Sequence, residues 1–557
     1  MKKLPIGIDD YKIVISENYY FVDKTLLIQE LLSTSSAVTL ICRPRRFGKT
    51  LNLSMLKYFF EKTEKSNANL FIDKKIWQYE DMRIKQGQHP VIFISFKDVK
   101  SKTFEAAYDR IALIISSEFE RHAQILLPML DEHQTEKYKS IISCKANSAT
   151  LEESLLFLSK LLCEHYGKRV MIFIDEYDAP IHVAYKNDYY DDCIGFIKGL
   201  LSSALKSNSN LERGVLTGIL RTAKESIFSD LNNLTVCTIL SDEFSDKFGF
   251  IQEEVEAIML EQQVPISIDS IKYWYNGYRA GEKTLIYNPW SILNCANKHG
   301  KLMTYWVNTS GNDLIKLLIA KANSTAKKEL EALLTDTPIV KPIEEAFTFS
   351  TIYQADNALW SLLLFSGYIT YTERVLTERG KYDCSLALPN HEIKELFKDF
   401  ITEIFNNAFQ DSEHLKEFFI ALISGKTSLV QELLQMFIIN NMSTFDLAIS
   451  QPEISYHMFI LGLLVTLEKT YSVRSNRESG YGRYDIMLIP YDKSQVGIIM
   501  EFKRAGEQSL EEAANIAIFQ IQNKQYASEL HALGVSHIIG YGIAFAGKNV
   551  FAKSIKL

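Results

Sequence analysis

"ICRPRRFGKTLNLSML", Ile41–Leu56, joins an apolar run to a helix-forming segment through a basic loop. The loop ends as the phosphate-loop pattern G-x-x-x-x-G-K-[ST] does, with Gly48, Lys49 and Thr50, but Arg43 stands where that pattern has its first glycine. The first glycine permits a tight backbone turn, and Pro44 could fix a different turn at the same place. The stretch is therefore either a phosphate loop of altered form or a basic loop that happens to contain G-K-T.

The composition is that of a globular chain without a dominant charge. Of its 557 residues, 47% are hydrophobic and 23% are charged, which favours two to four packed domains over disorder. The net charge of -7 provides no overall basic surface, so nucleic-acid binding would need a local basic patch. The seven cysteines are never spaced C-x-x-C, which predicts reduced thiols. Because neither a signal-peptide core nor a membrane-spanning apolar run occurs, we expect a soluble cytoplasmic protein that binds no membrane.

Short apolar runs alternate with helical patterns through the first third of the chain. Such runs, rich in β-branched residues, are typical of buried parallel strands; they occupy residues 37–42, 90–96, 169–178 and 213–220. We therefore predict an α/β fold with a parallel sheet in residues 1–300. Residues 301–442 show mainly the 3.6-residue period of helices and are expected to form a helical linking region. Residues 443–557 mix strand and helix patterns again and are expected to form a second α/β domain.

Two features that follow predicted strands indicate a nucleotide site. In a phosphate loop the backbone N–H groups and the start of the next helix hold the phosphates, the lysine reaches the β- and γ-phosphates, and the Ser/Thr hydroxyl binds Mg²⁺. The run "RVMIFIDEYD" ends in Asp175, which could hold Mg²⁺, and Glu176, which could orient or activate the attacking water. Each feature alone fits a solvated loop, but together they predict an NTP site. Its binding residues would be Arg46, Gly48, Lys49, Thr50 and Asp175.

A third strand, within "RGVLTGILRTAKES", carries two further candidates. Thr217 could sense the γ-phosphate, and Arg221 could pair with it as an arginine supplied by the same chain. Alternatively, Thr217 caps a helix and Arg221 lies on a solvated face.

Carboxylates and a lysine inside apolar strands mark a second candidate site near the C-terminus. Asp485 lies in "RYDIMLIP", and Glu501 and Lys503 lie two residues apart in "VGIIMEFKRA", so the last two project to the same face of a strand. If the two strands pair as a hairpin, Asp485 joins them. The two carboxylates could then hold Mg²⁺ while the lysine positions water or steadies developing charge on a phosphodiester. The alternative is an ordinary Glu–Lys pair with Asp485 at a strand edge.

Several motifs together resemble the bacterial AAA-ATPase-like family, in which a P-loop NTPase domain is fused to a C-terminal nuclease-like domain. They are spread over most of the chain: "YFVDKT", "CRPRRFGKTL", "IFIDEYDAPI", "GVLTGILR", "WYNGYR", "YNPWSILN", "YWVNTSGND" and "LWSLLLFSGY". The resemblance implies that R-P-R-R-F-G-K-T is the family's own form of the phosphate loop. Within "WYNGYR", we interpret Trp274 and Tyr278 as core aromatics around a glycine turn.

The segments "NRESGYGRYDIML" and "IIMEFKRA" resemble the PD-(D/E)XK nuclease superfamily, which implies a restriction-endonuclease-like α/β domain. The resemblance also implies that Glu453 could join the site from the preceding helix, although it could equally be an exposed acid at a helix start. Gln522 and Tyr526 on the later helix fit the superfamily's pattern as well. A possible basic patch for DNA comprises Arg474, Arg477, Arg483, Lys503 and Arg504, unless these form a solvated face.

These observations lead to one reading with two rivals. We expect ATP and Mg²⁺ at Lys49, Thr50 and Asp175 to govern metal-dependent cleavage of DNA phosphodiesters at Asp485, Glu501 and Lys503. In the first rival, the NTPase is a regulatory switch, and the nuclease-like fold is a binding module without cleavage. In the second, the C-terminal metal site is purely structural.

Overall fold

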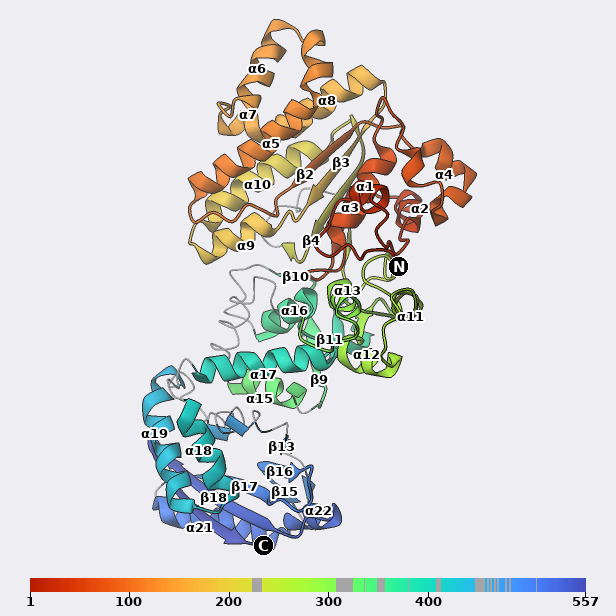
Figure 1. Ribbon diagram of the computed structural model, residues 1–557. Coiled ribbons are helices and arrows are strands. Elements are labelled where there is room, and N and C mark those ends of the chain that lie inside the picture. The colour runs from red at the N-terminus through yellow and green to blue at the C-terminus, as the bar shows by residue number, and fades with distance from the viewer. Residues whose placement is uncertain are drawn as a thin grey trace. The chain divides into compact units, whose positions relative to one another are not determined.

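The computed structural model forms two compact units (Figure 1). The first comprises Met1–Asn308 and Val340–Glu392, and the second comprises Thr309–Ile339 and Ile393–Leu557. The structure describes residues 1–222, 233–306, 324–334, 336–347, 356–378, 380–406, 412–445, 456–457, 460, 463–464, 467, 470–475, 478–479, 482–506 and 508–557. Within these ranges no helix is both long enough and apolar enough to cross a bilayer.

A five-stranded sheet forms the centre of the first unit. Its strand order is β2 (Val91–Ser95), β3 (Val170–Asp175), β4 (Leu211–Gly218), β1 (Val38–Cys42) and β6 (Leu234–Cys237). Every neighbouring pair is parallel, which confirms the expected parallel sheet. All residues of β1 and β3 are buried, because helices cover both faces of the sheet and the strands are apolar throughout.

The strand order decides which residues meet. Since β4 pairs with both β1 and β3, the carboxyl ends of these three strands lie next to one another at one edge of the sheet. Figure 1 shows α1 (Tyr11–Ser16) and α3 (Lys49–Phe60) on one side of the sheet. On the other side lie α5 (Phe104–Leu126), α8 (Ser154–Tyr166) and α10 (Tyr190–Leu205). Ligands of open parallel sheets bind at this edge.

Helices and small sheets complete the first unit. The helices are α11 (Gln252–Glu261), α12 (Ile268–Tyr275), α13 (Pro289–Asn297) and α16 (Asp356–Ser366). The strands are β7 (Tyr278–Ala280), β8 (Thr284–Ile286), β9 (Ile339–Ile343), β10 (Ala346–Phe347), β11 (Thr370–Leu376) and β12 (Tyr382–Ala387). Four of these strands, β9 to β12, fall in the region 301–442 that was expected to be helical. The β11–β12 hairpin escaped prediction because Glu373 and Arg374 in β11, and Lys381 directly before β12, are residue types that helices also favour.

The second unit contains a mixed sheet in the order β13 (Tyr471–Ser475), β16 (Ile486–Pro490), β17 (Gly497–Arg504), β18 (Ile538–Ala546) and β19 (Asn549–Lys556). Only the β17–β18 pair is parallel. Helix α21 (Leu510–Asn523) packs closely on β18, because a Cβ at Gly542 would lie 2.5 Å from the Ala514 carbonyl oxygen. Further helices of this unit are α15 (Ser324–Leu334), α18 (Ser412–Ile423), α19 (Thr427–Phe445) and α22 (Ala527–Ala532).

Candidate functional site

The loop between β1 and α3 turns through two residues with left-handed backbone conformation. Gly48 directly precedes α3 and has a φ of +82°, a left-handed conformation that glycine adopts without strain. Arg46 is also left-handed, with a φ of +67°. The loop thus turns sharply between a buried strand and the start of a 12-residue helix, where backbone N–H groups and the helix dipole favour an anion.

Lys49 lies inside this loop rather than on its surface. Its Nζ donates hydrogen bonds of 2.9 Å to the carbonyl oxygens of Arg43 and Pro44, and the residue is only 6% exposed. Burial lowers the pKa of Lys49, and the nearby charge of Glu176 opposes that shift. The ammonium group is therefore wrapped by the loop that it would help to hold around a phosphate.

Asp175 joins three secondary-structure elements at the sheet edge. Its carboxylate is fully buried and accepts hydrogen bonds from Thr50 Oγ1 at 2.8 Å and from Thr217 Oγ1 at 2.5 Å. Ser95 Oγ, at the end of β2, lies 3.4 Å from the same carboxylate. The structure thus brings together Thr50, Asp175 and Thr217. Sequence reasoning missed Ser95, although it ends one of the predicted strands.

Glu176 follows Asp175 in a left-handed conformation, with a φ of +50°. Its backbone N–H lies 3.3 Å from Thr217 Oγ1. Burial raises the pKa of the Glu176 carboxyl, and the charge of Lys49 partly offsets the rise. A carboxylate with a raised pKa is a better proton acceptor near neutral pH, which suits the role proposed for it.

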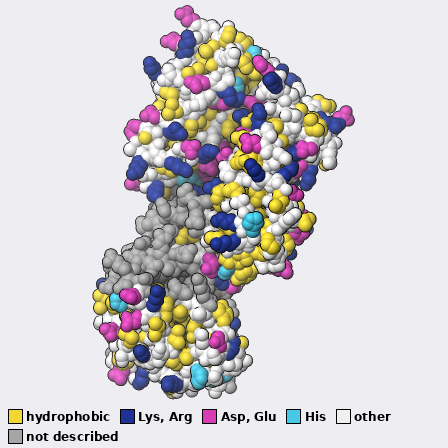
Figure 2. All heavy atoms as spheres, viewed as in Figure 1, with side chains coloured by type: hydrophobic (Ala, Val, Ile, Leu, Met, Phe, Trp, Pro, Cys, Tyr) yellow, Lys and Arg dark blue, Asp and Glu magenta, His cyan; other side chains and the backbone are white. Residues whose placement is uncertain are grey.

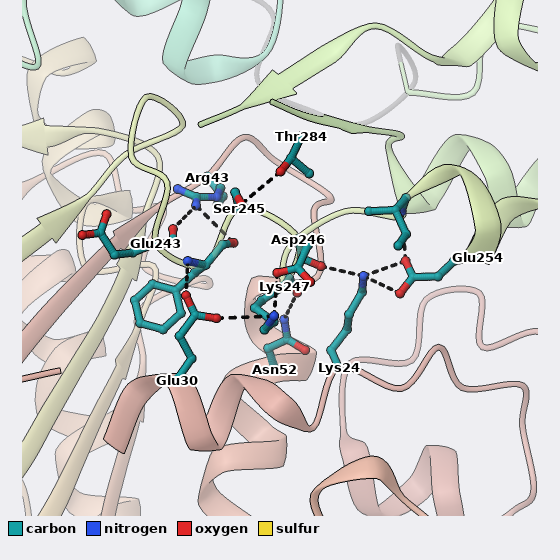
Figure 3. A network of polar contacts seen from close by, with 12 residues as sticks. Lys24, Glu30, Arg43, Asn52, Glu243, Ser245, Asp246, Lys247, Glu254 and Thr284 are labelled. Atoms are coloured by element: carbon teal, nitrogen blue, oxygen red, sulfur yellow. Dashed lines mark hydrogen bonds and ion pairs between the residues drawn. The ribbon is translucent and has the colours of Figure 1, made fainter. Parts of the chain in front are cut away.

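Arg43, which stands at the first-glycine position of the phosphate-loop pattern, has a structural role of its own. Its guanidinium is fully buried and donates to the carbonyl oxygens of Cys42, Cys237, Thr238, Glu243 and Phe244 at 2.6–3.3 Å. Figure 3 shows the side chain directed toward the Glu243–Ser245 segment. Arg43 therefore anchors the chain that follows β6 to the phosphate loop. This role could not be predicted from the sequence, because most of the acceptors are backbone atoms up to 201 residues away.

Ion pairs hold the same segment against the first helices (Figure 3). Lys24 Nζ bonds to Glu254 at 2.6 Å and to the Asp246 carbonyl oxygen at 2.7 Å. Lys247 Nζ lies 3.4 Å from Glu30, on α2 (Leu26–Ser33), and Asn52 of α3 donates to the Lys247 carbonyl oxygen at 2.9 Å. Together with Arg43, these contacts fix residues 243–254 beside the phosphate loop.

Aromatic residues from the motifs that follow the sheet pack on the loop itself. The Arg46 guanidinium lies 4.3 Å from the Trp290 ring centre, and Phe47 packs edge-on against Tyr278 at 5.2 Å. Trp306 Nε1 donates to the Arg45 carbonyl oxygen at 3.4 Å. Tyr278 is buried, in agreement with its interpretation as a core aromatic. Tyr278 of "WYNGYR", Trp290 of "YNPWSILN" and Trp306 of "YWVNTSGND" thus each contact the loop.

A buried carboxylate supports the Trp306 contact. Glu392 accepts hydrogen bonds from the backbone N–H groups of Tyr305 at 2.6 Å and Trp306 at 2.8 Å, and from Ser291 Oγ at 2.7 Å. Burial raises the pKa of Glu392 to about 7, although these three hydrogen bonds oppose the rise. Sequence reasoning did not single out Glu392.

Arg221 lies at a distinct place in the fold. It begins β5 (Arg221–Thr222), which pairs in parallel with β10 rather than continuing the main sheet. Thr217, four residues earlier, makes the contact with Asp175. A phosphate contact by Arg221 therefore stays a prediction.

In the second unit, strand pairing brings the predicted residues together. Ile486 lies opposite Met500 in the antiparallel β16–β17 pair, so Asp485, one residue before β16, lies beside Glu501. Asp485 Oδ2 accepts a 2.7 Å hydrogen bond from the Phe502 backbone N–H, and Lys503 Nζ lies 3.0 Å from Glu501 Oε1. The predicted hairpin thus forms.

Glu501 has the properties of a cation ligand. It is 2% exposed, and its Oε2 is buried with no hydrogen-bond partner among the described residues. Burial, together with the charge of Asp485, raises the pKa of Glu501 to about 7, while Lys503 opposes the rise. A buried carboxylate oxygen without a donor is costly, and a divalent cation would satisfy it.

The wider surroundings are only partly described. Over the described residues, no three His, Cys, Asp or Glu side chains are grouped to hold a metal ion. Glu453 and Arg477 lie outside those residues. Of the possible basic patch, Arg483 and Arg504 are exposed, but Arg474 is paired with Glu529.

The later helix supplies a different glutamine from the one expected. Gln522 is exposed, whereas Gln520 Nε2 donates to the Tyr526 hydroxyl at 3.1 Å. That hydroxyl donates to the Arg483 carbonyl oxygen at 2.6 Å, two residues before Asp485. Helix periodicity explains the difference, because positions 520 and 522 point about 200° apart.

Comparison with known proteins finds matches to two separate parts of the chain. Residues 5–228 match the model of a family described as predicted AAA-ATPase, and residues 451–555 match that of the PD-(D/E)XK nuclease superfamily. An Azotobacter chroococcum mcd 1 protein, described as an uncharacterized protein in the vnfD 5' region, is 27% identical over 401 residues, which cover 71% of this chain and 68% of that protein. No solved structure matches the chain. The chain is therefore similar to a predicted AAA-ATPase family over residues 5–228 and to the PD-(D/E)XK nuclease superfamily over residues 451–555.

Proposed function

We propose that the protein binds ATP with Mg²⁺ in its first domain and uses that binding to govern metal-dependent cleavage of DNA phosphodiesters in its last domain. The observation that carries the proposal is Glu501. Its buried Oε2, which has no hydrogen-bond partner in the part of the chain that the structure describes, lies in a carboxylate that also contacts Lys503 and neighbours Asp485, a set that supports a nuclease site.

At the nucleotide site each residue has a defined task. Backbone N–H groups around Gly48 would bind the phosphates, and Lys49 would turn from the loop carbonyls toward the β- and γ-phosphates. Thr50 and Asp175, already 2.8 Å apart, would hold Mg²⁺ directly or through water. Glu176, with its raised pKa, would orient or accept a proton from the attacking water.

At the second site Asp485 and Glu501 would hold the Mg²⁺ ion, which when bound supplies a Lewis acid for the phosphodiester. Lys503 would shift from Glu501 toward the phosphate, where it positions the attacking water or steadies the developing charge. Cleavage would form a bond from water oxygen to phosphorus and break the bond from phosphorus to the leaving oxygen.

Nucleic acid would bind through a local surface. On the face shown in Figure 2, basic and acidic side chains are interspersed over the first unit, in line with the net charge of -7. Arg483 and Arg504 are exposed near the second site in sequence and are our candidates for phosphate contacts.

A second candidate function is a nucleotide-dependent switch whose nuclease-like domain binds without cutting. The absence of a three-ligand cluster among the described residues favours this alternative, because two carboxylates hold a metal less firmly.

One set of variants separates the two functions. Wild type, Lys49→Ala and Glu501→Ala are assayed for Mg²⁺- or Mn²⁺-dependent degradation of single- and double-stranded DNA, with and without ATP, and for ATP binding by calorimetry. Lys65→Ala and Glu511→Ala, both at exposed positions, are matched controls. We expect Glu501→Ala to lose DNA cleavage but to bind ATP with the affinity of the wild type. We expect Lys49→Ala to lose ATP binding and, with it, the effect of ATP on cleavage. If the wild type binds ATP but cleaves no DNA under any condition, the nuclease function is wrong and the nucleotide-dependent switch remains. If Lys49→Ala binds ATP as well as the wild type does, the assignment of the phosphate loop is wrong.

A further inference from the structure

The carboxylate of Asp178 binds the turn that leaves β4. Asp178 is 2% exposed, and its Oδ2 accepts hydrogen bonds from the backbone N–H groups of Ile219 at 2.8 Å and Leu220 at 3.0 Å. His182 Nε2, one helical turn later in α9 (Ala179–Lys186), lies 3.3 Å from the same oxygen. Burial alone would raise the pKa of Asp178, but His182 and the two amides hold it below its usual range. The group is thus kept as a carboxylate.

The residues next to Asp178 bind the same turn. The Tyr177 hydroxyl donates to the Leu220 carbonyl oxygen at 2.6 Å, and the Tyr177 backbone N–H donates to the Thr217 carbonyl oxygen at 3.1 Å. A Cβ at Gly218 would lie 2.6 Å from the Tyr177 ring and 3.0 Å from Asp178 Oδ1, so only glycine fits there. Residues 176–178, directly after β3, therefore contact residues 217–220, which are the last two residues of β4 and the two that follow it.

This connection lies directly beside the proposed nucleotide site. Glu176 precedes Tyr177, and its N–H points at Thr217 Oγ1, which in turn bonds to Asp175. Arg221 follows Leu220 and begins β5, which pairs with β10 of residues 346–347. A movement of Glu176 toward or away from a terminal phosphate would therefore reach β5 through Asp178.

We propose that Asp178 is a positioning residue that couples Glu176 to the Gly218–Arg221 turn, so that the turn distinguishes a bound nucleoside triphosphate from a diphosphate. The inference rests on the proposed nucleotide site. Asp178 is unsuited to act as the catalytic base, because three donors already engage its Oδ2. Its role is to couple the position of the turn after β4 to the position of Asp175 and Glu176 at the end of β3.

Hydrogen–deuterium exchange of the full chain tests this directly. Exchange is followed at residues 43–50, which report nucleotide binding, and at residues 218–222, which report the turn, with MgATP, with MgADP and without nucleotide. In the wild type we expect both nucleotides to protect 43–50 and the exchange rate of 218–222 to differ between them by about tenfold, the effect of one hydrogen bond to a charged group. In Asp178→Asn we expect similar protection of 43–50 but no ATP–ADP difference at 218–222. Asp192→Asn, at an exposed position of α10, serves as the control.

The outcomes separate the inference from the function on which it rests. Protection of 43–50 without an ATP–ADP difference at 218–222 in the wild type, or persistence of that difference in Asp178→Asn, overturns the coupling role alone. No protection of 43–50 by either nucleotide overturns the nucleotide site and the inference with it. If Asp178→Asn fails to fold, Tyr177→Phe, which removes the hydroxyl that donates to the Leu220 carbonyl oxygen, must reduce the difference for the inference to stand.

Discussion

The Thr217 hydroxyl donates a 2.5 Å hydrogen bond to Asp175 Oδ1, which ties the end of β4 to the end of β3. Thr50 engages the other carboxylate oxygen from α3, so one buried acid connects three elements. The strand order makes this possible, because β4 lies between the strand that precedes the phosphate loop and the strand that ends in Asp175. In the proposed nucleotide site, this arrangement would place a hydroxyl from β4 between a terminal phosphate and Asp175, the proposed metal ligand.

Thr217→Val should weaken ATP binding more than ADP binding. Valine keeps the shape and burial of threonine but removes the hydroxyl that would reach the terminal phosphate, and a hydrogen bond to a charged group is worth roughly tenfold or more in affinity. Isothermal titration calorimetry with both nucleotides measures the difference. Thr39→Val is the matched control, because Thr39 Oγ1 is buried on β1 without a hydrogen-bond partner among the described residues. An equal loss for ATP and ADP would contradict a role in sensing the third phosphate.

Arg43→Gly, which restores the usual first glycine, should destabilise the protein instead of improving the loop. Five carbonyl oxygens would lose a common donor, and several of them are buried, so we expect a cost of about 3 kcal/mol or more. A fall in the thermal unfolding midpoint measures this cost. Arg110→Ala, at an exposed position of α5, is the control. Alanine is used there because glycine would itself destabilise the helix. A variant as stable as the wild type would show that the guanidinium contributes no net stability.

DNA cleavage should rise as pH increases through about 7. The carboxyl of Glu501 has a pKa of about 7, and only its ionised form binds a divalent cation well. The pH profile of cleavage at fixed Mg²⁺ concentration measures this. A profile whose midpoint lies near the ordinary carboxyl value would show that ionisation of Glu501 does not limit metal binding.

The raised pKa of Glu501 predicts that the stability of the fold changes with pH in the opposite direction to DNA cleavage. Between pH 4.5 and 7 the folded protein holds a proton on Glu501 that the unfolded chain has lost, so stability falls as pH rises through this window. Glu501→Gln removes that fall. At pH values above 7 the variant should therefore have a higher thermal unfolding midpoint than the wild type, with a gain of about 1–3 kcal/mol in the free energy of unfolding. Mn²⁺ should stabilise the wild type but not the variant, since a metal that binds only the folded site shifts unfolding. Glu511→Gln, at an exposed position, should change neither response.

Glu392→Gln should be neutral near pH 5 and stabilising near pH 8. The pKa of Glu392 is raised to about 7, so above that pH the wild type buries a charge, whereas glutamine can still accept the N–H groups of Tyr305 and Trp306. Thermal midpoints at both pH values measure the effect. A loss of stability at both would mean that the carboxylate is needed in its charged form.

The sequence allowed prediction of the features that depend on local pattern. The order of an apolar strand, a glycine and an amphipathic helix made it possible to predict the positions of Gly48, Lys49 and Thr50. The alternation of side chains along a strand predicted that Glu501 and Lys503 lie on one face. Asp485 could be added because a hairpin was assumed, and the register supports that assumption.

Residues whose partners are backbone atoms of distant segments escaped prediction. Arg43 binds carbonyl oxygens, Asp178 binds amide N–H groups, and Glu392 binds both amides and a hydroxyl. Every residue offers such backbone groups, so no letter in the sequence marks the acceptor or donor. The positions become identifiable only after the fold has brought the segments together.

The Arg43 anchor also sets the order in which the protein can be completed during synthesis. Its acceptors at Glu243 and Phe244 emerge from the ribosome about 200 residues after the phosphate loop, some 10–40 s later at ordinary rates of translation. Until then the positively charged guanidinium lacks its distant acceptors and has only the neighbouring Cys42 carbonyl oxygen, so the loop cannot take its final shape. A nascent chain that stops at residue 228 should therefore bind chaperones rather than nucleotide.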